Sequence, residues 1–368
     1  MKKILFSLCL IRRSAVFGIL AFACLLIGKR EPVDAQAVRP LLVIGSGQQT
    51  TFSGQATAVK ATVLGINTGI SDTGPLPPSG GAQQASLLSA SVPGLLTADA
   101  LHATTVGQGD ASDSHASVAD LNLTVLGNTI SASFIVARAL ARCAATTSGD
   151  PPAVSGSSQV AALTINGQTI AVSGQPNQTI NLPVGQVVIN EQQSSISGQT
   201  ASITVNALHV VINSSAGSAD VVISSAHADI TCPSGQPALC TGDDFEVGEG
   251  EDHNRDTGDS EEHSVASGTK QNEDGSQWGH FEFVRHGLNP LTVHATRITK
   301  FVRVDYFTRH IEGFCEINGE PGHTFTADMT DNHTRGGSDD FQMTTDRGDK
   351  GGNQLEHGDE ENEEPCDP

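Results

Sequence analysis

The chain has 368 residues, with 20 Lys and Arg against 41 Asp and Glu and a formal net charge of −21 at pH 7. So acidic a chain repels nucleic acid and anionic membrane surfaces, which excludes both as partners. The length allows two domains of ordinary size, and scarce aromatic residues (4%) beside many small and β-branched ones favour β-structure over a helical enzyme core.

Residues 1–35 have the order of a secretory signal peptide. Basic residues precede an apolar run at 14–28, and "VDAQA" at 33–37 offers a cleavage site after Ala35. The run is short for a membrane span, so we expect no stable span after cleavage and a secreted, extracellular or cell-surface location. An uncleaved anchor and a lipoprotein linked through Cys24 remain alternatives.

Residues 36–242 are predicted to form a larger antiparallel β-sandwich-like domain. Apolar and polar residues alternate with the period of two that a half-buried strand requires, and Asn166-Gly167 between two such runs indicates a tight hairpin. The segment 132–145 also permits a helix, but its alternation favours a strand. The runs lie at 55–65, 98–107, 118–127, 162–172, 186–192, 201–212 and 219–232.

A change in composition follows the sandwich. Residues 243–276 contain 12 acidic and 2 basic residues and few apolar ones, which predicts a disordered acidic linker. Alternation resumes at 277–345, where five short runs predict a second, small antiparallel β domain. Residues 346–368 carry nine acidic groups and are predicted to be a disordered tail. The fold class expected is therefore all-β.

Two stretches of the chain resemble a known family. Residues ~50–232, with "SGQATAVKATVLG", "ASVADLNLTVLGNTISAS", "LTINGQTI", "NLPVGQVVINEQ" and the closing "ADITC", resemble the secreted bacterial choice-of-anchor P proteins. Residues ~279–343, with "GHFEFVRHG" and "INGEPGHTFTADMTDN", resemble the small β domain that often follows that module. The resemblance implies an exported all-β surface or matrix protein without enzymatic activity, and the chain ends in "EENEEPCDP" without an anchoring motif.

Cysteine placement fits this picture. Cleavage leaves five cysteines, an odd number, and in an exported chain they are expected to form disulfides. Cys143 and Cys232 each end a strand run and are the first predicted pair, with Cys240 as the alternative partner. Cys315 and Cys366 are a second, tentative pair, and the alternative for Cys315 is a small buried side chain.

Candidate chemistry is sparse. The chain lacks the GxSxG, HExxH, P-loop and EF-hand patterns. Asp120, Glu191, Asp220 and Asp229 are isolated along their strands, and we expect Asp120 and Asp229 to face solvent and Glu191 to be structural. Histidines recur: metal ligation is weighed against ordinary hydrogen bonding for His209 and His227, and half-exposed strand faces account for those at 280, 286, 294, 310, 323 and 333.

The segment from Phe325 to Met343 is the candidate metal site. Its oxygen donors bracket a Gly-Gly loop, and Ca²⁺ prefers six to eight clustered oxygens. The alternative is that these Asp and Asn side chains only open and close the turn between two strands. The tentative calcium ligands are Asp328, Asp331, Asn332, Asp339 and Asp340.

The sequence thus predicts a non-enzymatic secreted or cell-surface structural or adhesion protein of a bacterium. Its expected partners are extracellular matrix or surface polymers, with glycan among them, and calcium is the one candidate cofactor. A calcium-assisted carbohydrate-binding module is the alternative, although a single Trp and a single Tyr leave few rings for sugar stacking. A secreted hydrolase is the third hypothesis.

Overall fold

The computed structural model describes residues 49–144, 150–233, 244–254, 261–272, 274–332 and 336–363. Every regular element in these ranges is a β-strand, which confirms the all-β class. None of the described residues forms a helix long and apolar enough to cross a membrane. The expected signal peptide, residues 1–35, lies outside these ranges.

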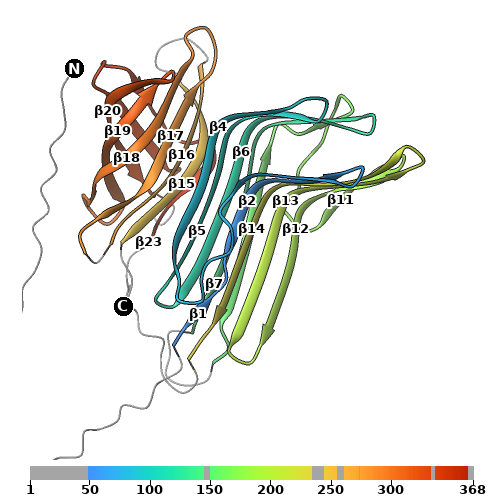
Figure 1. The fold of residues 1–368 in the computed structure, drawn as a ribbon, viewed down its shortest axis with the longest axis horizontal. Helices are drawn as coiled ribbons and strands as arrows, with labels where there is room; N and C mark the ends of the chain where they lie inside the picture. Colours follow the sequence, from blue (N-terminus) through green and yellow to red (C-terminus); the bar gives the residue numbers. More distant parts are fainter. Residues whose placement is uncertain are drawn as a thin grey trace, which may run out of the picture. The chain divides into compact units, whose positions relative to one another are not determined.

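Two seven-stranded antiparallel sheets make up the sandwich (Figure 1). The first sheet has the order β11-β12-β13-β14-β2-β3, with β1 beside β14, and the second has the order β10-β9-β7-β6-β5-β4, with β8 beside β7. The first sheet contains β1 (Thr51–Phe52), β2 (Gln55–Val63), β3 (Ile66–Asp72), β11 (Gln178–Leu182), β12 (Gly185–Ser197), β13 (Thr200–Ser214) and β14 (Gly217–Thr231). The second contains β4 (Gly81–Val92), β5 (Leu96–Gln108), β6 (Ala111–Val125), β7 (Asn128–Arg142), β8 (Ala153–Ala161), β9 (Thr164–Ile165) and β10 (Gln168–Thr169).

Alternating apolar residues of both sheets form one core between them. Val59 and Val210 from the first sheet and Leu101 and Ile135 from the second are fully buried in this cluster. Period-two alternation explains the arrangement, because successive side chains of a strand point to opposite faces. The segment 132–145 is a strand, as expected, since it contributes β7. Asn166-Gly167 forms the predicted turn between β9 and β10, with φ of 51° and 74°.

A third sheet of nine strands follows, in the order β22-β21-β20-β19-β18-β17-β16-β15-β23. It curls around its own apolar cluster, in which Phe281 stacks on Phe325 with ring centroids 4.8 Å apart. A bridge between Asp340 and Gln354 links β21 to the segment before β23. The strands are β15 (Phe245–Asn254), β16 (Glu261–Gln271), β17 (Gln277–Arg285), β18 (Leu291–Arg303), β19 (Thr308–Ile317), β20 (Glu320–Thr330), β21 (Asp340–Thr345), β22 (Lys350–Gly351) and β23 (His357–Glu363).

Two expectations about disorder are corrected by these strands. The described parts of the acidic segment 243–276 include β15 and β16, which pair with each other along their length. Part of the acidic tail 346–368 is also ordered, because β23 pairs with β15. The high charge content of these segments predicted disorder. In β15, however, the buried apolar residues Phe245 and Val247 alternate with other residues. Its acid Glu249 also accepts a hydrogen bond from Arg138 of the second sheet.

The second sheet is covered on both faces. On β6, the Ser114 hydroxyl donates to the carbonyl of His227 in the first sheet over 2.8 Å, whereas the adjacent His115 contacts Glu249 of the third sheet. The central strands of the second sheet are consequently buried along most of their length. Polar residues on their second face are therefore enclosed between sheets and not solvated.

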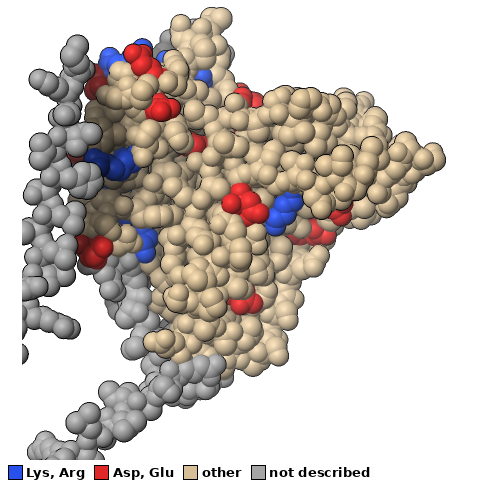
Figure 2. Space-filling view, viewed as in Figure 1, with Lys and Arg blue, Asp and Glu red and all other residues tan. Residues whose placement is uncertain are grey.

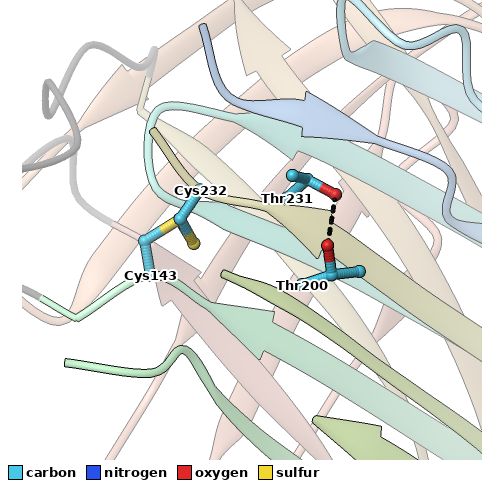
Figure 3. Close-up of a disulfide and its surroundings, with 4 residues drawn as sticks. All are labelled: Cys143, Thr200, Thr231 and Cys232. Carbon is cyan, nitrogen blue, oxygen red and sulfur yellow. Dashed lines mark hydrogen bonds between the residues drawn. A yellow bond between two sulfur atoms is a disulfide. The ribbon is translucent and has the colours of Figure 1, made fainter. Parts of the chain in front are cut away.

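One disulfide joins the two sheets of the sandwich (Figure 3). Cys143 follows β7 and Cys232 follows β14, and their Cα atoms are 5.7 Å apart, which confirms the first predicted pair. The alternative partner Cys240 lies outside the described residues. Cys315, for which a bridge to Cys366 was expected, is instead a buried free thiol; Cys366 also lies outside the described residues.

Candidate functional site

The densest chemistry of the described residues lies where the third sheet faces the second. We call this region the charged layer. It brings together residues from β6 and β7 of the second sheet and from β15 and β23 of the third. Its members are Asp113, His115, Arg138, Glu249, Asp359 and Glu361.

Glu249 is the centre of the charged layer. Its Oε1 lies 2.9 Å from Nε of Arg138 and 3.3 Å from Nδ1 of His115, and its side chain is 0% exposed. The other ring nitrogen of His115, Nε2, lies 3.1 Å from Oδ1 of Asp113. Arg138 also contacts Asp359, with Nη1 of Arg138 3.1 Å from Oδ2 of Asp359. Both nitrogens of His115 thus face carboxylates, a geometry that only the imidazolium form satisfies as a donor on both sides.

The charges of this layer set one another's protonation. Burial opposes ionisation of Glu249, but His115 and Arg138 outweigh it and hold the pKa of Glu249 at about 2. Burial likewise lowers the pKa of His115, yet Asp113 and Glu249 raise it well above its usual value. Burial raises the pKa of Asp359 to about 8, with a hydrogen bond to Asp339 adding to the effect. At neutral pH the layer therefore holds a charged His–Glu–Arg core beside a carboxyl group that retains its proton.

A second group of acids lies in the same inter-sheet region. We call it the acidic cluster: Asp99 of β5, Asp120 of β6, Glu251 of β15, Glu262 of β16 and His286, which follows β17. One ligand atom from each of Asp99, Asp120 and His286 lies within 4.8 Å of the others. Nδ1 of His286 is 3.1 Å from Oδ2 of Asp120. These three are placed as ligands of one ion would be.

The backbone of β5 and β6 positions the acidic cluster. The register of this strand pair shifts on either side of Asp99, which is a β-bulge or similar irregularity. Asp120 has φ of 47°, in the left-handed region that Asp tolerates better than most residues. Bulges re-aim side chains and are frequent beside functional sites.

Carboxyl groups are also buried on the inner face of the third sheet. Glu246 accepts hydrogen bonds from Thr269 (2.9 Å) and from Ser267, and Glu360 lies beside it. Burial raises the pKa of both carboxyls, and in Glu360 the neighbouring Glu246 raises it further. Two carboxylates so close together in a buried site share a proton. The protonated pair of Glu246 and Glu360 is therefore a structural contact.

The predicted calcium ligands mostly have other partners. Asp339 accepts the backbone N–H of Asn332 at 2.6 Å and that of Glu360 at 2.9 Å, which is the loop-closing role given as the alternative. Oδ1 of Asp328 lies 2.6 Å from Nδ1 of His310. Asp340 pairs with Thr330 at the start of β21. Among the described residues, the groups of three acidic or His ligands lie elsewhere, and the calcium site stays a prediction.

The structure also shows where His209, His227 and Glu191 lie and what they contact. His209 and His227 lie on adjacent strands but not opposite each other, since His209 pairs with Val222 and His227 with Thr204. Glu191 accepts from Asn206 and contacts His209, as a structural residue would.

Asp120, expected to be solvated, instead contacts His286, and this is the main site residue that sequence reasoning placed wrongly. His115, Arg138 and Glu249 were missed altogether. The alternation of Glu249 and Glu251 within β15 was the available signal.

Comparisons with known proteins add little. No family model matches the chain, and no curated protein matches it. A solved structure from Nitrosomonas europaea that carries the provisional name AttH is 11% identical, and the match covers 85% of this chain and 92% of that one. Its TM-score is 0.17, too low to support an inference about fold or function.

Proposed function

We propose that the chain is a non-enzymatic secreted or cell-surface structural protein of a bacterium, of the choice-of-anchor P kind, which adheres to extracellular material through a strand edge. The observation that carries the proposal is β4. This strand ends the second sheet, and among the described strands it forms a ladder with β5 alone.

The sequence of β4 leaves its edge unprotected. Its 12 residues, GAQQASLLSASV, contain no charged residue and no proline, and none is fully buried. Soluble proteins usually protect such edges with lysine, proline or bulges, because unpaired backbone groups there template pairing with another strand. Leu87 near its centre is 44% exposed and adds an apolar contact. A long, uncharged edge favours strand addition by a partner.

The surface around the sandwich supports this reading. Figure 2 shows one face on which charged side chains are few and scattered among uncharged ones. A face with few charged side chains can contact matrix polymers without repelling them, even though the whole chain is strongly acidic.

The experiment places a charge on the edge. Leu87→Lys adds a positive charge that opposes strand pairing at the edge of β4. As a control, Thr124→Lys adds the same charge at an exposed position of β6, an inner strand of the same sheet. We expect the β4 variant to lose retention in a matrix pull-down and in cell-surface fractions, with the β6 variant behaving as wild type. Equal retention of both variants would refute the role of the β4 edge.

A further inference from the structure

The acidic cluster groups four carboxyl groups, those of Asp99, Asp120, Glu251 and Glu262, with one imidazole, His286. Asp120 lies close enough to His286, Glu262 and Asp99 to interact with each of them electrostatically. In the charged layer, by contrast, Arg138 lies directly on Glu249 and already neutralises it.

One buried carboxylate of the cluster, Glu251, gives a second sign. Glu251 is 2% exposed, and its Oε2 has no hydrogen-bond partner. The rest of its carboxyl group hydrogen-bonds to Glu262 and Ser133, and Asp120 is close enough to interact with it electrostatically. A buried carboxylate oxygen without a partner costs free energy unless something neutralises it.

We propose that Asp99, Asp120 and His286 bind one divalent transition-metal cation, Zn²⁺ or Mn²⁺, with Glu251 closing the inner side of the site. Two ligand atoms each about 2.1 Å from an ion lie at most about 4.2 Å apart. The 3.1 Å between Nδ1 of His286 and Oδ2 of Asp120 falls inside that limit. The third ligand atom lies within 4.8 Å of both, so a small rotation of one side chain completes the set.

The donor set selects the kind of ion. An imidazole nitrogen suits zinc and its neighbours, whereas Ca²⁺ and Mg²⁺ prefer oxygen ligands throughout. The second nitrogen of His286, Nε2, lies 3.3 Å from the hydroxyl of Ser264, an outer contact that orients the ring. Side-chain exposures of 19% for His286 and 37% for Asp120 leave a path for the ion to enter.

The site differs in place from the calcium hairpin expected from the sequence. It joins β5 and β6 of the second sheet to the third sheet, so an ion there would cross-link the two sheets. Binding would relieve the repulsion between the acids and would add to the stability of the full chain.

Isothermal titration of the full chain, stripped of metal with a chelator and then titrated with ZnCl₂ or MnCl₂, tests the proposal. The informative variants are Asp120→Asn, in which Asn tolerates the left-handed backbone, and His286→Gln. The control is Asp220→Asn, which makes the same exchange at an exposed His–Asp contact of 3.2 Å. Its partner His209 holds Glu191 on the opposite ring nitrogen, so the three cannot share one ion.

We expect wild type and Asp220→Asn to show one equal saturable site, and each cluster variant to bind about tenfold more weakly or to lose that site. Co²⁺ substitution gives a direct readout: wild type should show visible absorption bands that His286→Gln lacks. No saturable site in wild type, or equal binding by both cluster variants when circular dichroism shows them folded, would overturn the proposal. If Asp120→Asn fails to fold, His286→Gln alone decides the outcome.

Discussion

Replacing Arg138 by Met tests whether the charged layer holds the second and third sheets together. Arg138 is 8% exposed and bonds Glu249, which is 0% exposed. Met keeps most of the side-chain volume but leaves Glu249 buried with one cation fewer. Removing one partner of a buried ion pair typically costs about 3–5 kcal/mol, because the remaining charge stays uncompensated.

The expected change in melting temperature depends on the number of residues in the compact unit, Ser46–Pro368. Unfolding entropy of about 2.1 cal/mol/K per residue over about 320 residues gives about 0.7 kcal/mol/K, so the melting temperature should fall by about 4–8 °C if the unit unfolds cooperatively. Urea unfolding, followed by tryptophan fluorescence and circular dichroism, measures the free energy of unfolding directly.

Two further variants make the interpretation specific. Arg138→Met with Glu249→Met removes both charges, and we expect it to recover at least half of the lost stability, since a well-packed apolar pair often replaces a buried ion pair at little cost. Lys300→Met breaks an exposed ion pair, Lys300 to Glu312 at 2.6 Å, and should leave the midpoint almost unchanged. If Arg138→Met matches Lys300→Met, the charged layer does not join the sheets and the reasoning is wrong.

Three other predictions follow from the same structure. Cys143→Ser with Cys232→Ser should lower the free energy of unfolding by about 4.6 kcal/mol, from loop-closure entropy over the 89-residue separation; a loss under about 1 kcal/mol in a urea titration would contradict it. The melting temperature should fall from pH 5 to pH 8, because folded pKa values near 8 for Glu251 and Asp359 mean that the native state holds protons the unfolded chain has released in this window. Below about pH 4.5 the trend reverses, because the unfolded chain takes up a proton on Glu249 while the native state, with a pKa of about 2 there, does not; scanning calorimetry between pH 3 and pH 9 should show a maximum, and a flat profile would refute these assignments. Calcium should raise the melting temperature relative to chelator if the hairpin site exists, and Asp331→Asn should remove that rise; no calcium shift in wild type would eliminate the site.

The strands of the sandwich were largely predictable from the sequence. Alternation identified β2, β6, β13 and β14, and Asn166-Gly167 identified a hairpin, because local geometry fixes both signals. The Cys143–Cys232 pair followed because both residues end strands. These features depend on neighbours in sequence or on one simple pairing.

The candidate site was hidden because it depends on contacts between distant segments. From the sequence alone, Glu249 is expected to be a solvated acid. In the fold, its partner is Arg138 of β7, which lies 111 residues earlier in the chain. Asp120 is likewise expected to be an outward-facing residue of its strand, but in the fold the third sheet covers that face. Charge composition describes the cost of burying such residues, but only the fold supplies the partners that offset it.

The order of the acidic strands changes how the C-terminal half is understood. β15 and β16 extend the small β domain expected at 277–345 into a larger sheet, with β23 on its outer side. The segment expected to separate two domains therefore forms part of the contact between the second and third sheets.

Protease shaving of intact producing cells, combined with fractionation and N-terminal sequencing of the released chain, tests the proposed function most directly. We predict that the protein is found outside the cell or on its surface, that its mature N-terminus follows Ala35, and that external protease removes it. A chain that remains wholly in the cytoplasm or periplasm, protected from external protease, would contradict the proposal of an extracellular structural or adhesion role.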